Sequence, residues 1–166
     1  HQKIIDYFGD GSRLGVKMEY IIEKEEMGTG GPLLLAEKML TDTFLVINGD
    51  GLFEKIDVKK LIETHKKHKA LVTLTLARTE DPSRFGVVVM EGERIVRFVE
   101  KPKKEEAPSN LVNAGFYCAD KKILSRIPKG FCKIEQEIFP KIASEGLMFG
   151  YITEGGWTDI GTLEDY

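Results

Sequence analysis

The chain has 166 residues, of which 42% are hydrophobic and 31% charged, a composition that excludes a disordered or collagen-like chain. Its 24 basic and 27 acidic residues are mixed along the sequence, so no charged surface for a nucleic-acid backbone is expected. No apolar run approaches the roughly 18 residues of a membrane span, and the start lacks a signal-peptide pattern. Cys118 and Cys132 are too few for a disulfide framework and are expected to be reduced. We expect one cytoplasmic domain over residues 1–166, with no nucleic-acid or membrane partner.

The first part of the chain is predicted to alternate between helical and extended segments. Four apolar residues at helical spacing have no capping residue ahead of them, which indicates an element that begins further upstream: Ile4, Ile5, Tyr7 and Phe8. Residues 16–22 follow a Gly-Asp-Gly-Ser turn and are predicted to form a strand. Pro32 suits the first turn of a helix, which is predicted over residues 33–40.

The next segments carry clearer patterns. Residues 44–47 are a continuous apolar run, typical of a strand that is covered on both faces. Asp57 is expected to cap a helix over residues 58–68, with an outer face formed by Lys59, Lys60, His65, Lys66, Lys67 and His68. Residues 70–77 are the next predicted strand. The resulting order β-α-β-α-β favours a mostly parallel sheet with helices on both faces.

The second half of the chain is predicted to be richer in strands. A Glu-Gly-Glu turn between two apolar runs indicates a hairpin. No stretch is long enough to act as a linker between two domains. The predicted elements are strands over residues 85–90, 94–99 and 111–118, a loop over 101–110, helices over 121–127 and 134–144, and a strand over 147–153.

Two aspartates in glycine-flanked turns are candidates for holding a divalent cation. Asp50 follows a buried strand, and open α/β sheets bind ligands beyond the carboxyl ends of their strands. Asp159 lies far away in sequence, in the glycine-rich segment 155–162. Mg²⁺ usually takes one or two carboxylates and completes its shell with water and phosphate oxygens, so the two aspartates could share one ion. A turn in which the aspartate only satisfies local backbone groups is equally compatible with the pattern at Asp50.

Further candidates lie at strand ends and in glycine-rich turns. Lys101 suits a phosphate and Glu100 suits sugar hydroxyls, although two surface charges before a loop would look the same. Gly115, within a predicted strand, indicates either close approach of a ligand or a bulge. Residues 28–32 lead into a helix, so their amides could meet a base or a phosphate. They match neither the Walker loop nor the dinucleotide fingerprint.

Three aromatic or imidazole side chains could bind a ligand or metal, but each also has an ordinary structural explanation. His65 and His68 lie at i, i+3 on the lysine-rich helix face, which favours solvated residues over metal ligands. Trp157 is either packed into the core or a stacking platform for a ligand.

Six motifs occur in a fixed order: MGTGG at 27–31, NGD at 48–50, RFGVV at 84–88, FVEKP at 98–102, NAGFY at 113–117 and WTDIGT at 157–162. As a set they closely resemble the sugar-1-phosphate nucleotidyltransferases, and most of all the mannose-1-phosphate guanylyltransferase-like branch. The resemblance runs from about Gly15 to Tyr166. It implies an α/β, Rossmann-like fold with a mixed, mostly parallel sheet flanked by helices, the nucleotide-diphospho-sugar transferase fold, here incomplete at its N-terminus.

The resemblance also implies a reaction and a set of site residues. A nucleoside triphosphate would donate its nucleotidyl group to a sugar 1-phosphate, giving pyrophosphate and a nucleotide-sugar of the GDP-mannose type. Carried over by position, Asp50 and Asp159 would hold Mg²⁺, and Lys101 would contact the sugar phosphate; these three are the expected catalytic residues. The implied substrate-binding residues are Gly28, Thr29, Asn48, Gly86, Glu100, Asn113, Gly115 and Trp157.

The chain departs from the family pattern at its start. The family's N-terminal strand, its glycine-rich loop with an arginine and the following Pro-Lys-Pro segment have no counterpart here. We therefore expect an exposed apolar strand flank, and either a fragment of a longer enzyme or a naturally truncated relative without turnover. A non-catalytic or regulatory relative that binds nucleotide-sugar is the alternative function. The sequence leaves the base, the sugar and the oligomeric state open, a homo-oligomer included.

Overall fold

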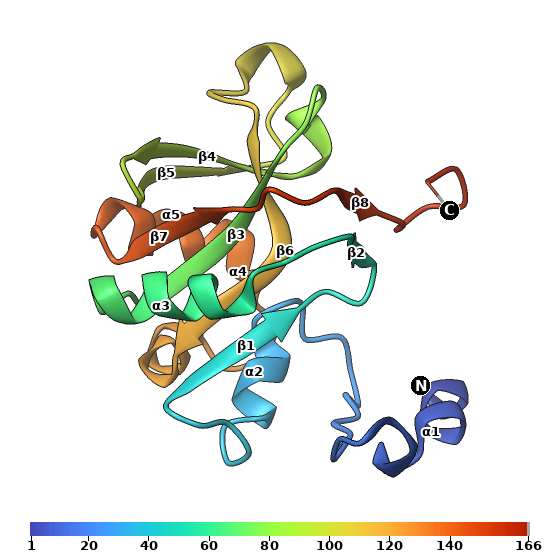
Figure 1. The fold of residues 1–166 in the computed structure, drawn as a ribbon. Coiled ribbons are helices and arrows are strands. Elements are labelled where there is room, and N and C mark those ends of the chain that lie inside the picture. The colour runs from blue at the N-terminus through green and yellow to red at the C-terminus, as the bar shows by residue number, and fades with distance from the viewer. Residues whose placement is uncertain (166) are drawn as a thin grey trace.

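The computed structural model describes residues 1–165 and shows an α/β fold built on one six-stranded sheet (Figure 1). The strands are β1 (Thr43–Ile47), β2 (Gly51–Phe53), β3 (Val72–Arg78), β4 (Gly86–Glu91), β5 (Arg94–Glu100), β6 (Leu111–Asp120), β7 (Met148–Ile152) and β8 (Trp157–Asp159). The α-helices are α1 (Gln2–Phe8), α2 (Gly31–Leu35), α3 (Val58–His68), α4 (Ile134–Glu137) and α5 (Phe139–Ser144). Short 3-10 helices are η1 (Ser12–Leu14), η2 (Pro82–Arg84), η3 (Lys104–Glu106) and η4 (Lys121–Arg126). Within residues 1–165, no helix has the length and apolar character needed to span a bilayer.

The main sheet is mixed, with the strand order β1-β6-β3-β7-β5-β4. Strand β6 pairs antiparallel with both β1 and β3, and β3 pairs in parallel with β7. Strands β1, β3 and β7 therefore run in the same direction, and the α/β class with a mixed sheet is confirmed. The neighbouring pairs are nevertheless mainly antiparallel, because β6 enters between β1 and β3 and the β4–β5 hairpin closes the other edge.

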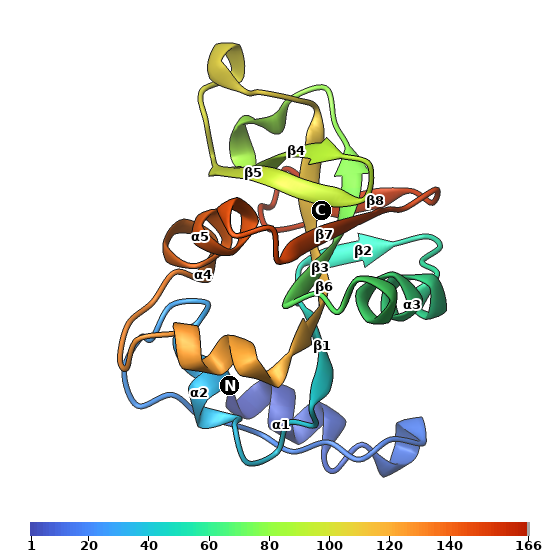
Figure 2. The ribbon, with the colours of Figure 1, turned by 90° about the vertical axis from the view of Figure 1, so that its left-hand side faces the viewer.

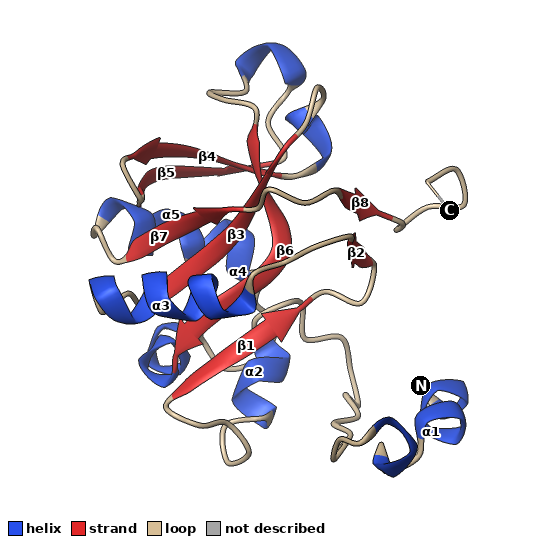
Figure 3. Ribbon diagram, viewed as in Figure 1, coloured by secondary structure: helices blue, strands red, loops and turns tan. Residues whose placement is uncertain are grey.

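Side chains of β6 alternate between the two faces of the sheet and so divide the core. Tyr117 belongs to the larger cluster, where its ring packs edge-on against Phe139 of α5. Phe116 and Cys118 belong to a second cluster that includes Leu61 of α3. In Figure 2 helix α3 lies on one side of the sheet and α4 and α5 lie on the other. Figure 3 distinguishes these helices from the strands of the sheet by colour. Cys118 and Cys132 are both buried, and neither is part of a disulfide.

Strand β1 is an edge strand that exposes apolar side chains. Among residues 1–165 its only ladder partner is β6. Leu45 and Ile47 are 41% and 59% exposed. The prediction that this run is covered on both faces is therefore wrong, whereas the exposed apolar flank expected from the missing family elements is present.

The segment ahead of β1 is less regular than its sequence pattern predicts. Helix α1 forms as expected, but none of its residues is buried. Residues 16–22 form a loop and not a strand, because no neighbouring strand satisfies their backbone groups, and Val16 and Ile22 are exposed. Helix α2 begins two residues before the predicted start and is followed by turns.

Helix α3 agrees with the prediction in extent but not in its histidines. The Asp57 side chain accepts the N–H of Lys60 at 2.9 Å and caps the helix. His65 is 3% exposed, with Nδ1 3.1 Å from the Thr73 hydroxyl oxygen, so placing it on a solvated face is wrong. His68 stacks on Phe149 at 4.2 Å between ring centroids. Both imidazoles therefore hold α3 against the sheet.

The predicted helices of the last third are shorter in the structure. Residues 121–126 form the 3-10 helix η4. The predicted helix over 134–144 is divided at Ile138 into α4 and α5, because Pro140 lies in the first turn of α5 and lacks the N–H that a continuous helix requires. The β4–β5 hairpin and the final strand of the main sheet are confirmed.

Candidate active site

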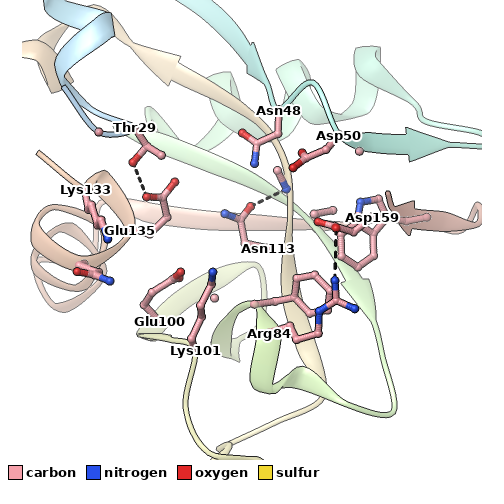
Figure 4. A pocket seen from close by; sticks show the side chains of 18 of the residues that line it. Thr29, Asn48, Asp50, Arg84, Glu100, Lys101, Asn113, Lys133, Glu135 and Asp159 are labelled. Carbon is pink, nitrogen blue, oxygen red and sulfur yellow. Dashed lines mark hydrogen bonds and ion pairs between the residues drawn. The ribbon is translucent and has the colours of Figure 1, made fainter. Parts of the chain in front are cut away.

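A cavity of about 500 Å³ opens where β1 ends and β6 begins. Figure 4 shows side chains from several separate segments pointing into it. Its lining includes all eleven residues that the sequence places in a site, namely Gly28, Thr29, Asn48, Asp50, Gly86, Glu100, Lys101, Asn113, Gly115, Trp157 and Asp159. The fold therefore brings the predicted residues into one place.

The two candidate metal ligands lie side by side. Strands β2 and β8 pair antiparallel with Gly51 opposite Asp159, and the N–H of Ile160 donates to the carbonyl of Asp50 at 2.9 Å. A Cβ on Gly161 would lie 3.0 Å from Asp159 Oδ1 and 3.4 Å from Asp50 Oδ2, so both carboxylates border one small space. This two-stranded sheet, which brings the aspartates together, was not predicted from the sequence.

The donor set of this space fits a hard divalent cation such as Mg²⁺, which takes one or two protein carboxylates. Within residues 1–165 no group of three or more His, Cys, Asp and Glu side chains could hold a metal, so water and substrate oxygens would complete the shell. Among the described lining residues the charged ones are mostly acidic: Glu23, Glu26, Asp50, Glu100, Glu135 and Asp159 against Arg84, Lys101 and Lys133. A phosphate ligand would need additional positive charge in such a cavity.

Glu100 is the last residue of β5 and Lys101 follows it, and both line the cavity. Glu100 Oε2 is buried without a hydrogen-bond partner within the described chain. Burial, and secondly the charge of Glu135, raise the pKa of Glu100. A Cβ on Gly86, which pairs with Glu100, would lie 2.9 Å from that same oxygen and 2.3 Å from the Phe98 ring, so only glycine fits there. Lys101 adopts a left-handed backbone conformation with φ of 45°, a strained geometry of the kind found at functional sites.

Asn113, Gly115 and Asn48 form the part of the wall next to Asp50. The register of β3 and β6 shifts between Leu74 and Leu76, close to Gly115, whose φ is +74°. The glycine therefore marks a bulge, and it also meets a close neighbour, because a Cβ there would lie 2.8 Å from Asn48 Nδ2. The Gly115 N–H donates to Asn113 Oδ1 at 3.1 Å, and the Asn48 N–H donates to the Gly115 carbonyl at 2.7 Å.

The glycine-rich segment 28–32 is hydrogen-bonded to the residues that precede α4. The Gly30 N–H donates to the Cys132 carbonyl at 2.8 Å, and a Cβ on Gly28 would lie 2.4 Å from that carbonyl oxygen. The Thr29 hydroxyl donates to Glu135 Oε2 at 2.5 Å and accepts the Ile134 N–H at 3.0 Å. This contact holds one end of the cavity in place.

Trp157 combines the two interpretations that its sequence left open. Its ring packs edge-on against Phe85 at 5.0 Å between centroids, and it also lines the cavity. Its Nε1 is buried without a partner among the described residues. A buried, unpaired indole N–H is a donor that a ligand or a water molecule can satisfy.

Several lining residues were not predicted from the sequence. They are Glu23, Glu26, Gly51, Arg84, Phe85, Ala114, Lys133, Glu135 and Gln136. Arg84 and Phe85 lie within a quoted motif, so their position next to Gly86 could have indicated them. Lys133 and Glu135 belong to a segment with an ordinary helical pattern, and only the tertiary contact with Thr29 places them in the cavity.

A family model described as nucleotidyl transferase matches residues 1–166. The chain belongs to the nucleotidyl transferase family. Mannose-1-phosphate guanylyltransferase of Mycobacterium tuberculosis is 40% identical over 164 residues, which cover 96% of this chain and 45% of that protein. The catalytic subunit beta of mannose-1-phosphate guanylyltransferase from Danio rerio is 41% identical over 159 residues, covering 93% and 43%. The chain thus spans about half the length of the curated relatives it matches.

Solved structures agree with this membership. HddC from Yersinia pseudotuberculosis, whose structure in complex with GMP-PN is known, superposes with a TM-score of 0.80 at 30% identity. The match covers 99% of this chain and 71% of HddC. The family resemblance stated from the six motifs and the expected α/β fold with a mixed sheet flanked by helices are therefore confirmed, whereas the expected predominance of parallel pairs is not, because β6 pairs antiparallel with both β1 and β3.

Proposed function

We propose that the chain carries the site at which the nucleotidyl group of a nucleoside triphosphate is coupled to a sugar 1-phosphate, giving a nucleotide-sugar and pyrophosphate. The observation that supports this most is the approach of Asp50 to Asp159 in the cavity that Lys101 also lines. The names of the sequence relatives, and the GMP-PN complex of HddC, support a guanine nucleotide and mannose 1-phosphate as the pair of substrates.

The chemistry requires one P–O bond to form and another to break. A phosphate oxygen of the sugar 1-phosphate attacks the α-phosphorus, and the bond from that phosphorus to the bridging oxygen of the β-phosphate breaks, so that pyrophosphate leaves with the electron pair. A divalent cation held by Asp50 and Asp159 would offset the negative charge that develops on the phosphate oxygens. Lys101 would bind the sugar phosphate as a point charge and hold it in line with the breaking bond.

The remaining walls of the cavity would orient the two substrates. The unpaired Oε2 of Glu100 is an acceptor for a sugar hydroxyl, and Asn113 offers an amide beside it. Because Gly86 has no side chain, the space next to the Glu100 carboxylate stays open for the sugar. At the other end, the loop around Gly28 and Thr29 would border the base through its backbone groups.

Turnover by aspartate variants tests the proposal. In the full-length protein, Asp50→Asn and Asp159→Asn should each reduce kcat by at least about 100-fold with GTP and mannose 1-phosphate, because each loses a charged oxygen ligand of the cation. Asp42→Asn is the matched control, since Asp42 is an exposed aspartate just before β1, the strand that Asp50 follows. Near-normal rates in both site variants would refute the metal role.

Calorimetry separates the enzyme from a non-catalytic relative. Titration with GDP-mannose, GTP and mannose 1-phosphate should show binding of all three, and mixing the last two with Mg²⁺ should release pyrophosphate. Binding of GDP-mannose without any turnover would instead identify a relative that only senses the nucleotide-sugar. The same titration with dTTP, UTP and CTP reports which base the loop around Thr29 accepts.

A further inference from the structure

Arg84 lies between two carboxylates at the edge of the cavity, and one of them is the candidate metal ligand Asp159. Its guanidinium donates two hydrogen bonds to Asp165, from Nη1 to Oδ1 at 3.0 Å and from Nη2 to Oδ2 at 2.6 Å. The same Nη2 lies 3.8 Å from Asp159 Oδ1, an ion pair drawn as a dashed line in Figure 4. One cation is thus shared between two acids, and it is closer to Asp165.

Asp165 is itself held by its own turn. The Thr162 hydroxyl donates to Asp165 Oδ2 at 2.7 Å, and the Asp165 N–H donates to the Thr162 carbonyl at 3.2 Å. Arg84 and Thr162 together lower the pKa of Asp165 to about 2, so this carboxylate is ionised throughout the neutral range. Asp165 therefore offers Arg84 a fixed, charged partner that does not depend on the cavity's contents.

The position of Arg84 bears on how tightly the aspartate pair can hold a cation. A guanidinium this near to Asp159 repels an incoming divalent ion, and it also competes for the carboxylate oxygens that the ion needs. A bidentate contact with another carboxylate draws the guanidinium away, because Arg pairs best with both oxygens of one acid. The two acids around Arg84 consequently have opposite effects on the metal site.

We propose that Arg84 and Asp165 set the affinity of the Asp50–Asp159 pair for its divalent cation: Arg84 competes with the cation for Asp159, and Asp165 restrains Arg84. This inference rests on the metal role proposed above for the two aspartates. Arg84 is a positioning residue in this scheme, since it acts through Asp159 and not on the substrate. Neither Arg84 nor Asp165 has a role that was predicted from the sequence.

The proposal predicts shifts of opposite sign in two variants. Arg84→Met should tighten Mn²⁺ binding by about fivefold, because a competing charge is removed at a partly exposed site. Asp165→Asn should weaken it by about threefold, because the freed guanidinium turns fully to Asp159. In the Arg84→Met background, Asp165→Asn should have almost no further effect.

The experiment is a Mn²⁺ titration of the full-length protein without nucleotide, with free Mn²⁺ read by electron paramagnetic resonance at low salt. Arg126→Met is the matched control, because Arg126 makes the same bidentate pair with Glu145 at 3.0 and 2.9 Å outside the cavity. Arg84→Lys keeps the charge and should stay closer to wild type than Arg84→Met. Circular dichroism and thermal melting verify that each variant is folded.

The outcomes distinguish a failure of this inference from a failure of the metal site on which it rests. If Asp159→Asn abolishes Mn²⁺ binding but Arg84→Met leaves the affinity unchanged, competition by Arg84 is wrong and the metal site stands. If Asp165→Asn weakens binding equally in both backgrounds, Asp165 acts by its own charge, and its restraint of Arg84 is wrong. If Asp159→Asn itself binds Mn²⁺ normally, the proposed metal site fails, and the inference fails with it.

Discussion

Gly115→Ala tests whether the bulge in β6 shapes the cavity. Gly115 has a φ of +74°, and an added Cβ would lie 2.8 Å from Asn48 Nδ2. The left-handed backbone should cost alanine about 1 kcal/mol. Moving the Asn48 side chain off its preferred rotamer should cost about 1 kcal/mol more. At roughly 2–4 °C per kcal/mol for a domain of this size, the melting temperature should fall by about 4–8 °C.

Gly146→Ala separates the two contributions. Its φ is +75°, nearly the same as at Gly115, but nothing lies within 4 Å of an added Cβ. It should therefore lower the melting temperature by only about 2–4 °C, which is the backbone share alone. Calorimetry should show weaker binding of mannose 1-phosphate or GTP in Gly115→Ala and unchanged binding in Gly146→Ala. Equal losses of stability together with unchanged binding in both variants would refute the reasoning.

Three further predictions follow from single contacts. Asp57→Ala removes the cap of α3 and should lower the free energy of unfolding in urea by about 1 kcal/mol, whereas an unchanged midpoint would mean that the cap contributes nothing. Thr29→Val loses the bonds to Glu135 and to the α4 backbone and should weaken nucleotide binding, while Thr29→Ser should retain it; equal affinities would contradict this. Because burial raises the pKa of Glu100, the folded state holds that proton more tightly than the unfolded chain. Relative to Glu100→Gln, the wild type should therefore lose stability as pH rises from about 4.5, the ordinary value, and parallel pH profiles would contradict the assignment.

The sequence predicted the parts of the fold whose patterns are local. Asp57 and the apolar spacing behind it define α3, and the turn between β4 and β5 defines a hairpin. The strand predicted over residues 16–22 failed because a strand forms only against a partner, and β-pattern alone does not supply one. The antiparallel position of β6 between β1 and β3 likewise depends on which strands pair with each other. The hydrophobic periodicity of the sequence does not encode this pairing.

The site was predictable in its members but not in its geometry. The six motifs named eleven residues, and one cavity holds them all. The β2–β8 pairing that brings Asp50 to Asp159 rests on two three-residue strands with no pattern of their own. At His65 the sequence pattern predicted the wrong environment. The basic face of the helix predicted exposure, but the imidazole is buried against the sheet, next to the Thr73 hydroxyl.

The proposed function depends most directly on Asp50 and Asp159 holding the same ion. A Mn²⁺ titration that counts bound ions in wild type, in each aspartate-to-asparagine variant and in the double variant measures this. We predict one strong site, a loss of affinity of at least about tenfold in either single variant, and little further loss in the double variant, because each carboxylate serves the same cation. Two independent ions, one lost with each aspartate, or an affinity that neither substitution changes, would contradict it.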